Sequence, residues 1–162
     1  MVNVDVLFDI VEKENIQIEY VKLPKDIQGI YYKAENLPPI IGINRNIINN
    51  APLFKTILAE EIGHHFTTFG DTTAECFSYI EKLLITKKEN LALKWATDLL
   101  IPTPFLVQAI QDNISTIYDL AEFFCVTEDF IRLKLYFINI DSKAYTYCES
   151  EIRRMNYDSC NL

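Results

Sequence analysis

The stretch AEEIGHH, residues 59–65, decides how the rest of this sequence is interpreted. His64 and His65 are the only two histidines of the chain, and Glu60 and Glu61 precede them by four residues each. Positions i and i+4 share one face of an α-helix, so a helix here would place two carboxylates and two imidazoles on one arc. Burying such a cluster is costly unless a positive charge neutralises it, and a divalent zinc ion would do so.

The residues around this stretch predict a helix from about residue 51 to residue 69. Asn50 supplies an acceptor that can cap free backbone amides, and Pro52 loses no hydrogen bond in the first helical turn. The arc of acids and histidines adjoins an apolar stripe that consists of Phe54, Leu58, Ile62, Phe66 and Phe69. We therefore expect the cluster at the edge of the core and not in open solvent.

The same spacing also fits a solvated helix edge, on which Glu60 pairs with His64 or Glu61 with His65. Such exposed pairs are common and individually weak, so the spacing alone does not establish a metal site. A more specific feature is the similarity to H-E-x-x-H, in which two histidines bind zinc and the intervening glutamate activates a water molecule. Here Glu60 replaces the first histidine, and a carboxylate is still a competent zinc ligand.

The chain ahead of this helix predicts one helix and a small sheet. A helix over residues 2–14 is indicated by apolar residues at spacings of three and four, namely Val4, Leu7, Phe8 and Val11. Alternating apolar residues from Ile16, then GIYYK at 29–33 and IIGIN at 40–44, predict three short strands.

After the histidines the sequence predicts only helices. Asp71, in the helix-breaking segment FGDTT, can cap a helix over residues 73–86, and a further helix over 88–100 should end before IPTP, where two prolines prevent continuation. Three shorter helices follow, each preceded by a threonine that can cap it, at about 104–111, 116–124 and 128–138. The polar tail from Lys143 is expected to be irregular or helical.

Composition limits the class of protein. The chain has 162 residues, 49% of them hydrophobic and 23% charged, which is typical of a soluble globular domain. It shows neither the layout of a secretory signal nor a run of about 18 apolar residues, so a cytoplasmic protein without a membrane partner is predicted. A net charge of -8 repels phosphate backbones and disfavours a nucleic acid partner. A cysteine metal site is not expected, because no CxxC pair occurs among Cys76, Cys125, Cys148 and Cys160.

The strings ILAEEIGHHFTTFGD at 57–71 and KKENLALKWATDLLIP at 87–102 resemble the ImmA/IrrE family of zinc metallo-endopeptidases. The similarity covers roughly residues 16–138. Together with the helix and strand patterns it implies an α+β, mostly helical fold, in which a zincin-like three-stranded sheet packs on a metal-site helix. The expected domains are a peptidase domain at 1–102 and a helical C-terminal region at 103–162, packed together as one compact unit.

Carried over to this sequence, the resemblance implies that Glu60 and His64 are zinc ligands and that Glu61 is the general base. Glu89 would be the third ligand, because it opens the helix that ends in LLIP, where the family's glutamate ligand is found. His65 is a possible additional site residue that could orient a ligand or stabilise the oxyanion.

The third ligand position has rivals. Glu89 also fits a solvated acid in the run KKEN, and Asp71, Glu75 and Glu81 all follow the metal-site helix closely. Asp71 is the best of these rivals, although a helix cap explains it more simply. A site of two carboxylates and one histidine makes zinc a weaker Lewis acid than two histidines do, and manganese or iron could also bind there.

The resemblance further implies the substrate class. It would be a DNA-binding repressor of the mobile element or stress regulon that is encoded beside the peptidase. The main alternative is a non-catalytic protein-binding module that keeps the peptidase fold. A third alternative, a DNA-binding regulator, would use the helix-turn-helix pattern of residues 115–138. Its charges disfavour it, because the segment from Asp112 to Leu135 holds five acids against Arg132 and Lys134.

Overall fold

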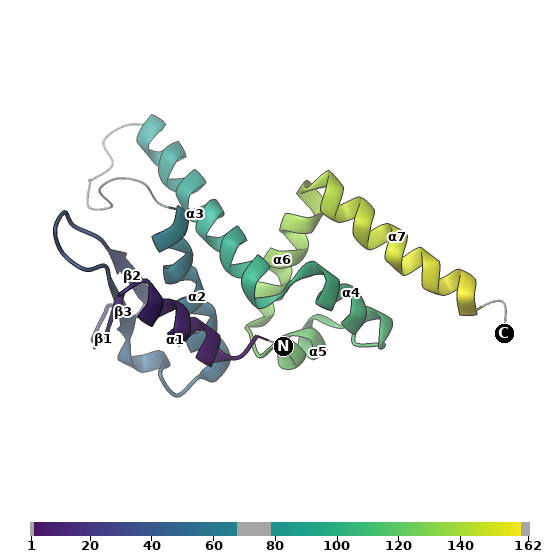
Figure 1. The fold of residues 1–162 in the computed structure, drawn as a ribbon, viewed down its shortest axis with the longest axis horizontal. Coiled ribbons are helices and arrows are strands. Elements are labelled where there is room, and N and C mark those ends of the chain that lie inside the picture. Colours follow the sequence, from purple (N-terminus) through teal and green to yellow (C-terminus); the bar gives the residue numbers. More distant parts are fainter. Residues whose placement is uncertain (1, 68–78, 160–162) are drawn as a thin grey trace. The chain divides into compact units, whose positions relative to one another are not determined.

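The chain is organised as two compact units, one spanning residues 2–96 and the other beginning at residue 97. The computed structural model describes residues 2–67 and 79–159 (Figure 1). The described part contains seven helices and one three-stranded sheet, so the predicted α+β, mostly helical fold is confirmed. The first unit holds the sheet and the helices α1 (Val4–Lys13), α2 (Ala51–Thr67) and most of α3 (Tyr79–Leu100).

The sheet has the strand order β1-β3-β2 and is mixed. Strand β1 (Gln17–Val21) runs parallel to β3 (Ile40–Asn44), and β2 (Gly29–Tyr32) runs antiparallel to it, with Tyr31 opposite Ile41. A short 3-10 turn, η1 (Arg45–Ile47), links β3 to the segment before α2. All three strands lie where the alternating sequence predicts them.

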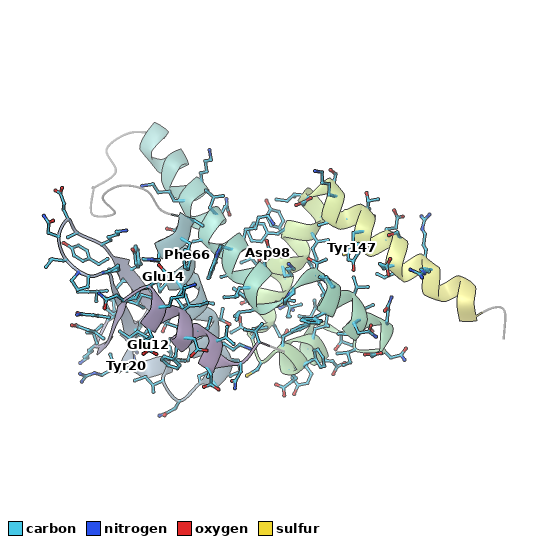
Figure 2. All side chains as sticks on the ribbon, in the orientation of Figure 1. Glu12, Glu14, Tyr20, Phe66, Asp98 and Tyr147 are labelled. Atoms are coloured by element: carbon cyan, nitrogen blue, oxygen red, sulfur yellow. The ribbon has the colours of Figure 1, made fainter. Side chains whose placement is uncertain are left out.

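Helix α2 fills the core of this unit, because Leu58 and Ile62 are fully buried and the helix contacts β2, β3 and α1. Near the start of α2, the ring of Phe54 lies between those of Phe8 and Tyr20, at centroid distances of 6.3 and 6.4 Å. Tyr20 is labelled in Figure 2. The predicted apolar stripe is wrong at Phe66, which is 39% exposed. Its ring stacks on Trp95 of α3 at the edge of the core. Phe69 lies outside the described residues.

The second unit is helical throughout its described length. It contains the end of α3 and four further helices, α4 (Thr103–Gln111), α5 (Ile117–Phe124), α6 (Glu128–Ile140) and α7 (Ser142–Ser159). Its core includes the ammonium of Lys134, which is 1% exposed and lies 2.6 Å from Asp98. An exposed partner thus satisfies a buried charge that an apolar core would not tolerate alone.

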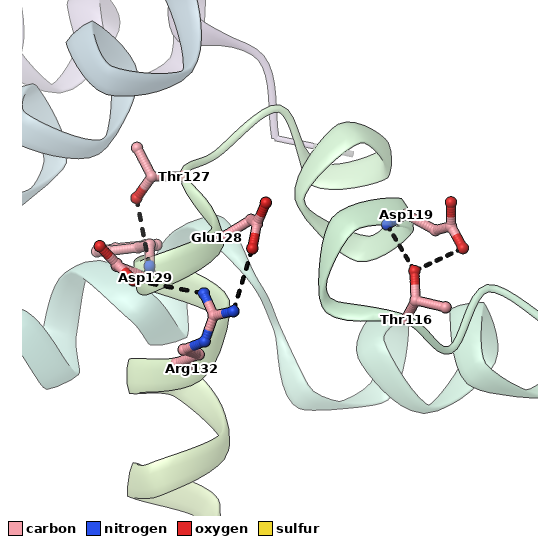
Figure 3. Close-up of polar contacts among 7 residues, drawn as sticks. Thr116, Asp119, Thr127, Glu128, Asp129 and Arg132 are labelled. Atoms are coloured by element: carbon pink, nitrogen blue, oxygen red, sulfur yellow. Dashed lines mark hydrogen bonds and ion pairs between the residues drawn. The ribbon is translucent and has the colours of Figure 1, made fainter.

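The threonine caps explain where two of these helices begin. The Thr116 hydroxyl accepts a hydrogen bond from the Asp119 backbone, and Thr127 accepts one from Phe130 (Figure 3). The predicted cap at Thr103 is wrong, because α4 begins one residue earlier than expected and Pro102 precedes it without a side-chain cap. Proline tolerates this position, since the first helical amides have no intrahelical partner.

The helices after α2 also differ from the prediction in how the segment before α4 is divided. Helix α3 runs unbroken from Tyr79 to Leu100, so the predicted separation into helices at 73–86 and 88–100 is wrong. No glycine or proline lies between residues 79 and 100, and Lys and Glu are good helix formers. The proposed cap Asp71 lies outside the described residues. None of the described helices is long and apolar enough to cross a membrane.

Asn44, at the end of β3, holds the loop between β1 and β2. Its side chain is fully buried, and its amide nitrogen donates to the carbonyls of Leu23, Pro24 and Ile27 at 3.3, 3.2 and 2.8 Å. Its oxygen accepts from the backbone of Asn46. One side chain thus satisfies backbone groups that the adjacent strand does not reach.

Replacing Asn44 by Ala should lower the free energy of unfolding by about 1–3 kcal/mol, because several buried carbonyls lose their donor. Asn44→Asp should be similarly harmful, since a carboxylate cannot donate. Urea unfolding measures the loss, and the exposed Asn46→Ala serves as a control with an expected change within about 0.5 kcal/mol. Equal stabilities of Asn44→Ala and the control would refute this role.

Candidate metal centre

Helix α2 presents different residues to its neighbours on its different sides. Gly63 packs against the backbone of Ala92 in α3, while Ile57 and Glu61 lie against Gly29 of β2. Glu60 and His64, one helical turn apart, share the side that faces Glu89 of α3. The AEEIGHH stretch is therefore the part of α2 that meets both α3 and the sheet.

Glu60, His64 and Glu89 come together into a group that could hold a metal ion. One ligand atom from each side chain lies within 4.8 Å of the others, and the His64 Nε2 to Glu89 Oε2 distance is 3.3 Å. His64 is 12% exposed and Glu89 is 48% exposed, so the group opens to solvent on the α3 side. These are the residues that the sequence predicted as ligands; the side chains of the rivals Asp71, Glu75 and Glu81 lie outside the described part.

The charges of this group favour a bound cation. Burial raises the pKa of Glu60, an effect that His64 opposes and Glu89 reinforces. Burial lowers the pKa of His64, but the hydrogen bond to Glu89 and the surrounding carboxylates outweigh it and raise that pKa. The same hydrogen bond lowers the pKa of Glu89. In the metal-free protein His64 therefore keeps its positive charge to a higher pH than a free imidazole would. Two carboxylates with one imidazole suit zinc, manganese or iron.

Glu61 is the most perturbed carboxyl of the centre. It is 6% exposed, and burial raises its pKa to about 8, with the nearby Glu60 and Glu89 adding to the effect and His64 opposing it. A methyl group on Gly29 would lie 2.5 Å from its Oε1, so the glycine makes the room that the carboxyl occupies. Glu61 is adjacent to the three-residue group without belonging to it, as a general base would be.

His65 points away from the group of possible ligands. Its Nδ1 lies 3.0 Å from the hydroxyl of Tyr31, and its Nε2 lies 3.5 Å from the Glu14 carboxylate (Figure 2). Burial raises the pKa of Tyr31, so its hydroxyl stays protonated. It donates to Nδ1 when the ring proton is on Nε2 and accepts when Nδ1 carries the proton. Both ring nitrogens are therefore engaged, and His65 joins α1, α2 and β2 instead of completing the metal site.

The sequence did not reveal Glu14 and Tyr31 as partners of His65. Tyr31 occupies an inward position in the alternation of GIYYK, which marks it as a core residue. Glu14 is one of several acids at the end of α1, and no spacing rule connects it to a histidine 51 positions later. Only the packing of α1 against α2 brings them together.

Comparison with known proteins adds no relative. No family model matches the chain, and neither a curated protein nor a solved structure matches it. The similarity to the ImmA/IrrE motifs therefore stays a prediction, and the function must be inferred from the residues of the centre.

The raised pKa of Glu61 predicts how stability depends on pH in the metal-free protein. Between the ordinary value of 4.5 and about 8, the folded state keeps a proton that the unfolded state has lost, so the free energy of unfolding falls as pH rises. Glu61→Gln has no such proton. We expect it to be more stable than wild type by roughly 2–4 kcal/mol at pH 8 and about equal to it near pH 4.5.

Urea unfolding in the presence of a chelator, at several pH values, measures this difference. Glu14→Gln is the matched control, because this carboxyl is 32% exposed and lies outside the group of Glu60, His64 and Glu89. A stability difference between Glu61→Gln and wild type that does not change with pH would show that Glu61 is ionised in the folded protein.

Proposed function

We propose that this chain is a metal-dependent endopeptidase of the ImmA/IrrE kind, with a zinc ion held by Glu60, His64 and Glu89. The observation that carries the proposal is the convergence of these three side chains from two helices, with Glu61 beside them. The sequence motifs point to the same three residues. Three protein ligands leave an open position, which is the arrangement of catalytic zinc sites.

The bound ion would act as a Lewis acid toward a peptide carbonyl and would make a water molecule more acidic. Glu61 is the proton carrier of the reaction. Its carboxylate accepts a proton from the attacking water, whose oxygen forms a bond to the carbonyl carbon, and then delivers that proton to the amide nitrogen as the C–N bond breaks. A nearby cation lowers the pKa of a carboxyl, so the value of about 8 in the metal-free protein would fall toward the range that suits a base at neutral pH.

The substrate in this proposal is a protein, specifically a DNA-binding repressor, and the enzyme works in the cytoplasm. A repressor carries a basic surface, which the net charge of -8 attracts. Direct binding of nucleic acid is not part of the proposal. On α6, the guanidinium of Arg132 already pairs with Glu128 and Asp129, at 3.1 and 3.4 Å, so it offers little charge to a phosphate (Figure 3).

A non-catalytic protein-binding module is the second candidate. The feature that favours it is the burial of Glu61, which is 6% exposed and packed against Gly29. If water cannot reach Glu61, this residue cannot act as a base. The protein would then act only by binding a partner, with or without a metal ion. In that case Glu61→Gln would keep the full biological effect of the protein.

Metal content tests the proposal. Purified wild-type protein should hold close to one zinc ion per chain by mass spectrometry, and His64→Ala and Glu89→Ala should each lose it, because a site with two remaining ligands binds weakly. His65→Ala is the matched control at the neighbouring position and should keep the metal, since both nitrogens of His65 have other partners.

Glu61→Gln separates the metal site from its chemistry. This variant should bind zinc as wild type does and should fail to cleave a repressor that wild type cleaves, with a loss of at least about 100-fold, as expected for a missing general base. Wild-type protein that takes up no metal even when zinc is supplied would refute the peptidase proposal. Cleavage that survives Glu61→Gln would refute the role of Glu61.

A further inference from the structure

Gly63 occupies the closest approach between α2 and α3. A Cβ atom built on it would lie 2.5 Å from the carbonyl oxygen of Ala92, 3.1 Å from the carbonyl carbon and 3.2 Å from the Cα. All three atoms belong to the helix backbone. A flexible side chain could rotate away from an added methyl group, but a helix backbone moves only together with its neighbours, so α3 itself would have to shift.

The neighbouring residues keep this approach close along the helices. Ala59 on α2 and Ala92 and Ala96 on α3 are fully buried, and none of them has a side chain longer than a methyl group. The distance between packed helices depends on the side chains at their contact, and small ones allow the backbones to approach. Phe66 and Trp95 stack beside this contact, with ring centroids 5.0 Å apart, and hold the two helices in register.

The contact at Gly63 adjoins the possible metal ligands on both helices. His64 follows Gly63 directly, and Glu89 lies three residues before Ala92, which places it on the same side of α3. A displacement of α3 at Ala92 therefore displaces Glu89 relative to His64, whose nitrogen is 3.3 Å from the Glu89 carboxylate. Metal–ligand distances in proteins lie within about 0.2 Å of their usual values, so a small shift of the helix is enough to disturb coordination.

We propose that Gly63 is a positioning residue of the metal centre: its missing side chain sets the separation of α2 and α3 and so places Glu89 against His64. The inference rests on the proposed function in one respect, namely that Glu60, His64 and Glu89 bind a divalent ion. It assigns to the glycine of AEEIGHH a role that the motif comparison did not give it.

Gly29 provides a matched control for the same chemical change. A methyl group on Gly29 would lie 2.5 Å from Oε1 of Glu61 and 2.6 Å from Cγ2 of Ile57, distances as short as those at Gly63 but to side-chain atoms, which can rotate away. These atoms lie on the side of α2 roughly opposite to Gly63, because two residues along a helix correspond to about 200° of rotation. Gly29→Ala thus crowds α2 from the sheet side at Glu61, which is not one of the proposed zinc ligands, and leaves the contact of α2 with α3 in place. Zinc affinity, and not cleavage, is therefore the quantity to compare.

The experiment compares zinc affinity in wild type, Gly63→Ala and Gly29→Ala, measured by competition with a chromophoric zinc chelator, with urea unfolding of all three. We expect Gly63→Ala to weaken zinc binding about 10- to 100-fold, the range seen when a residue that orients a ligand is changed, and Gly29→Ala to weaken it less than about 3-fold. The visible spectrum of the cobalt-substituted proteins should change in Gly63→Ala alone.

A crystal structure of metal-free Gly63→Ala tests the geometry without any metal. The expected result is a longer distance between His64 Nε2 and Glu89 Oε2 than 3.3 Å. An unchanged distance, an unchanged zinc affinity of Gly63→Ala, or equal losses in both variants would each overturn the proposal, since equal losses indicate a general loosening of α2. Wild type that binds no zinc would instead refute the metal centre, and the crystal structure would still decide the role of Gly63.

Discussion

The concentration of negative charge around His64 is the constraint on which the first unit depends. Glu60, Glu61 and Glu89 all lie close enough to affect its pKa, and only His64 is available within this group to carry a positive charge. Carboxylates that approach this closely in a partly buried place need protons or a cation. In the metal-free protein the pKa of His64 is raised and that of Glu61 is raised to about 8, so both groups hold their protons to a higher pH than usual. A divalent cation could replace both of these protons, which is why the same residues indicate a metal site.

Much of the fold could be predicted from local patterns, because the signals that define each element lie within it. The strands follow from alternation, and Asn50, Thr116 and Thr127 cap α2, α5 and α6 as their positions suggest. The division of α3 into two helices was an error of the same local kind, since a charged run without glycine or proline does not end a helix.

The site could be predicted only in part, and the reason is the range of its contacts. Helical spacing places Glu60, Glu61 and His64 together on α2, but their roles, and the choice of Glu89 on another helix, are indicated only by the family resemblance. The partners of His65 come from α1 and β2, and the close contact of Gly63 with Ala92 depends on how two helices pack. None of these contacts leaves a periodic trace in the sequence, because each joins residues whose separation along the chain is arbitrary.

If the proposed site binds an ion, Glu60 in place of the first histidine of the motif makes proton transfer depend less on the ion and more on the protein. Two carboxylates would make the ion a weaker Lewis acid and a bound water molecule less acidic. Removal of a proton from that water would then depend more on the strength of the base. In the proposed mechanism that base is Glu61, which is 6% exposed; the burial that raises its pKa in the metal-free protein would also leave it more basic beside a cation than a solvated carboxyl in the same place. A weaker acid and a stronger base can still match each other, provided that the two are held at a fixed distance. Gly63 is where the chain controls how closely α3, which carries Glu89, approaches α2, while Gly29 makes room for the side chain of Glu61.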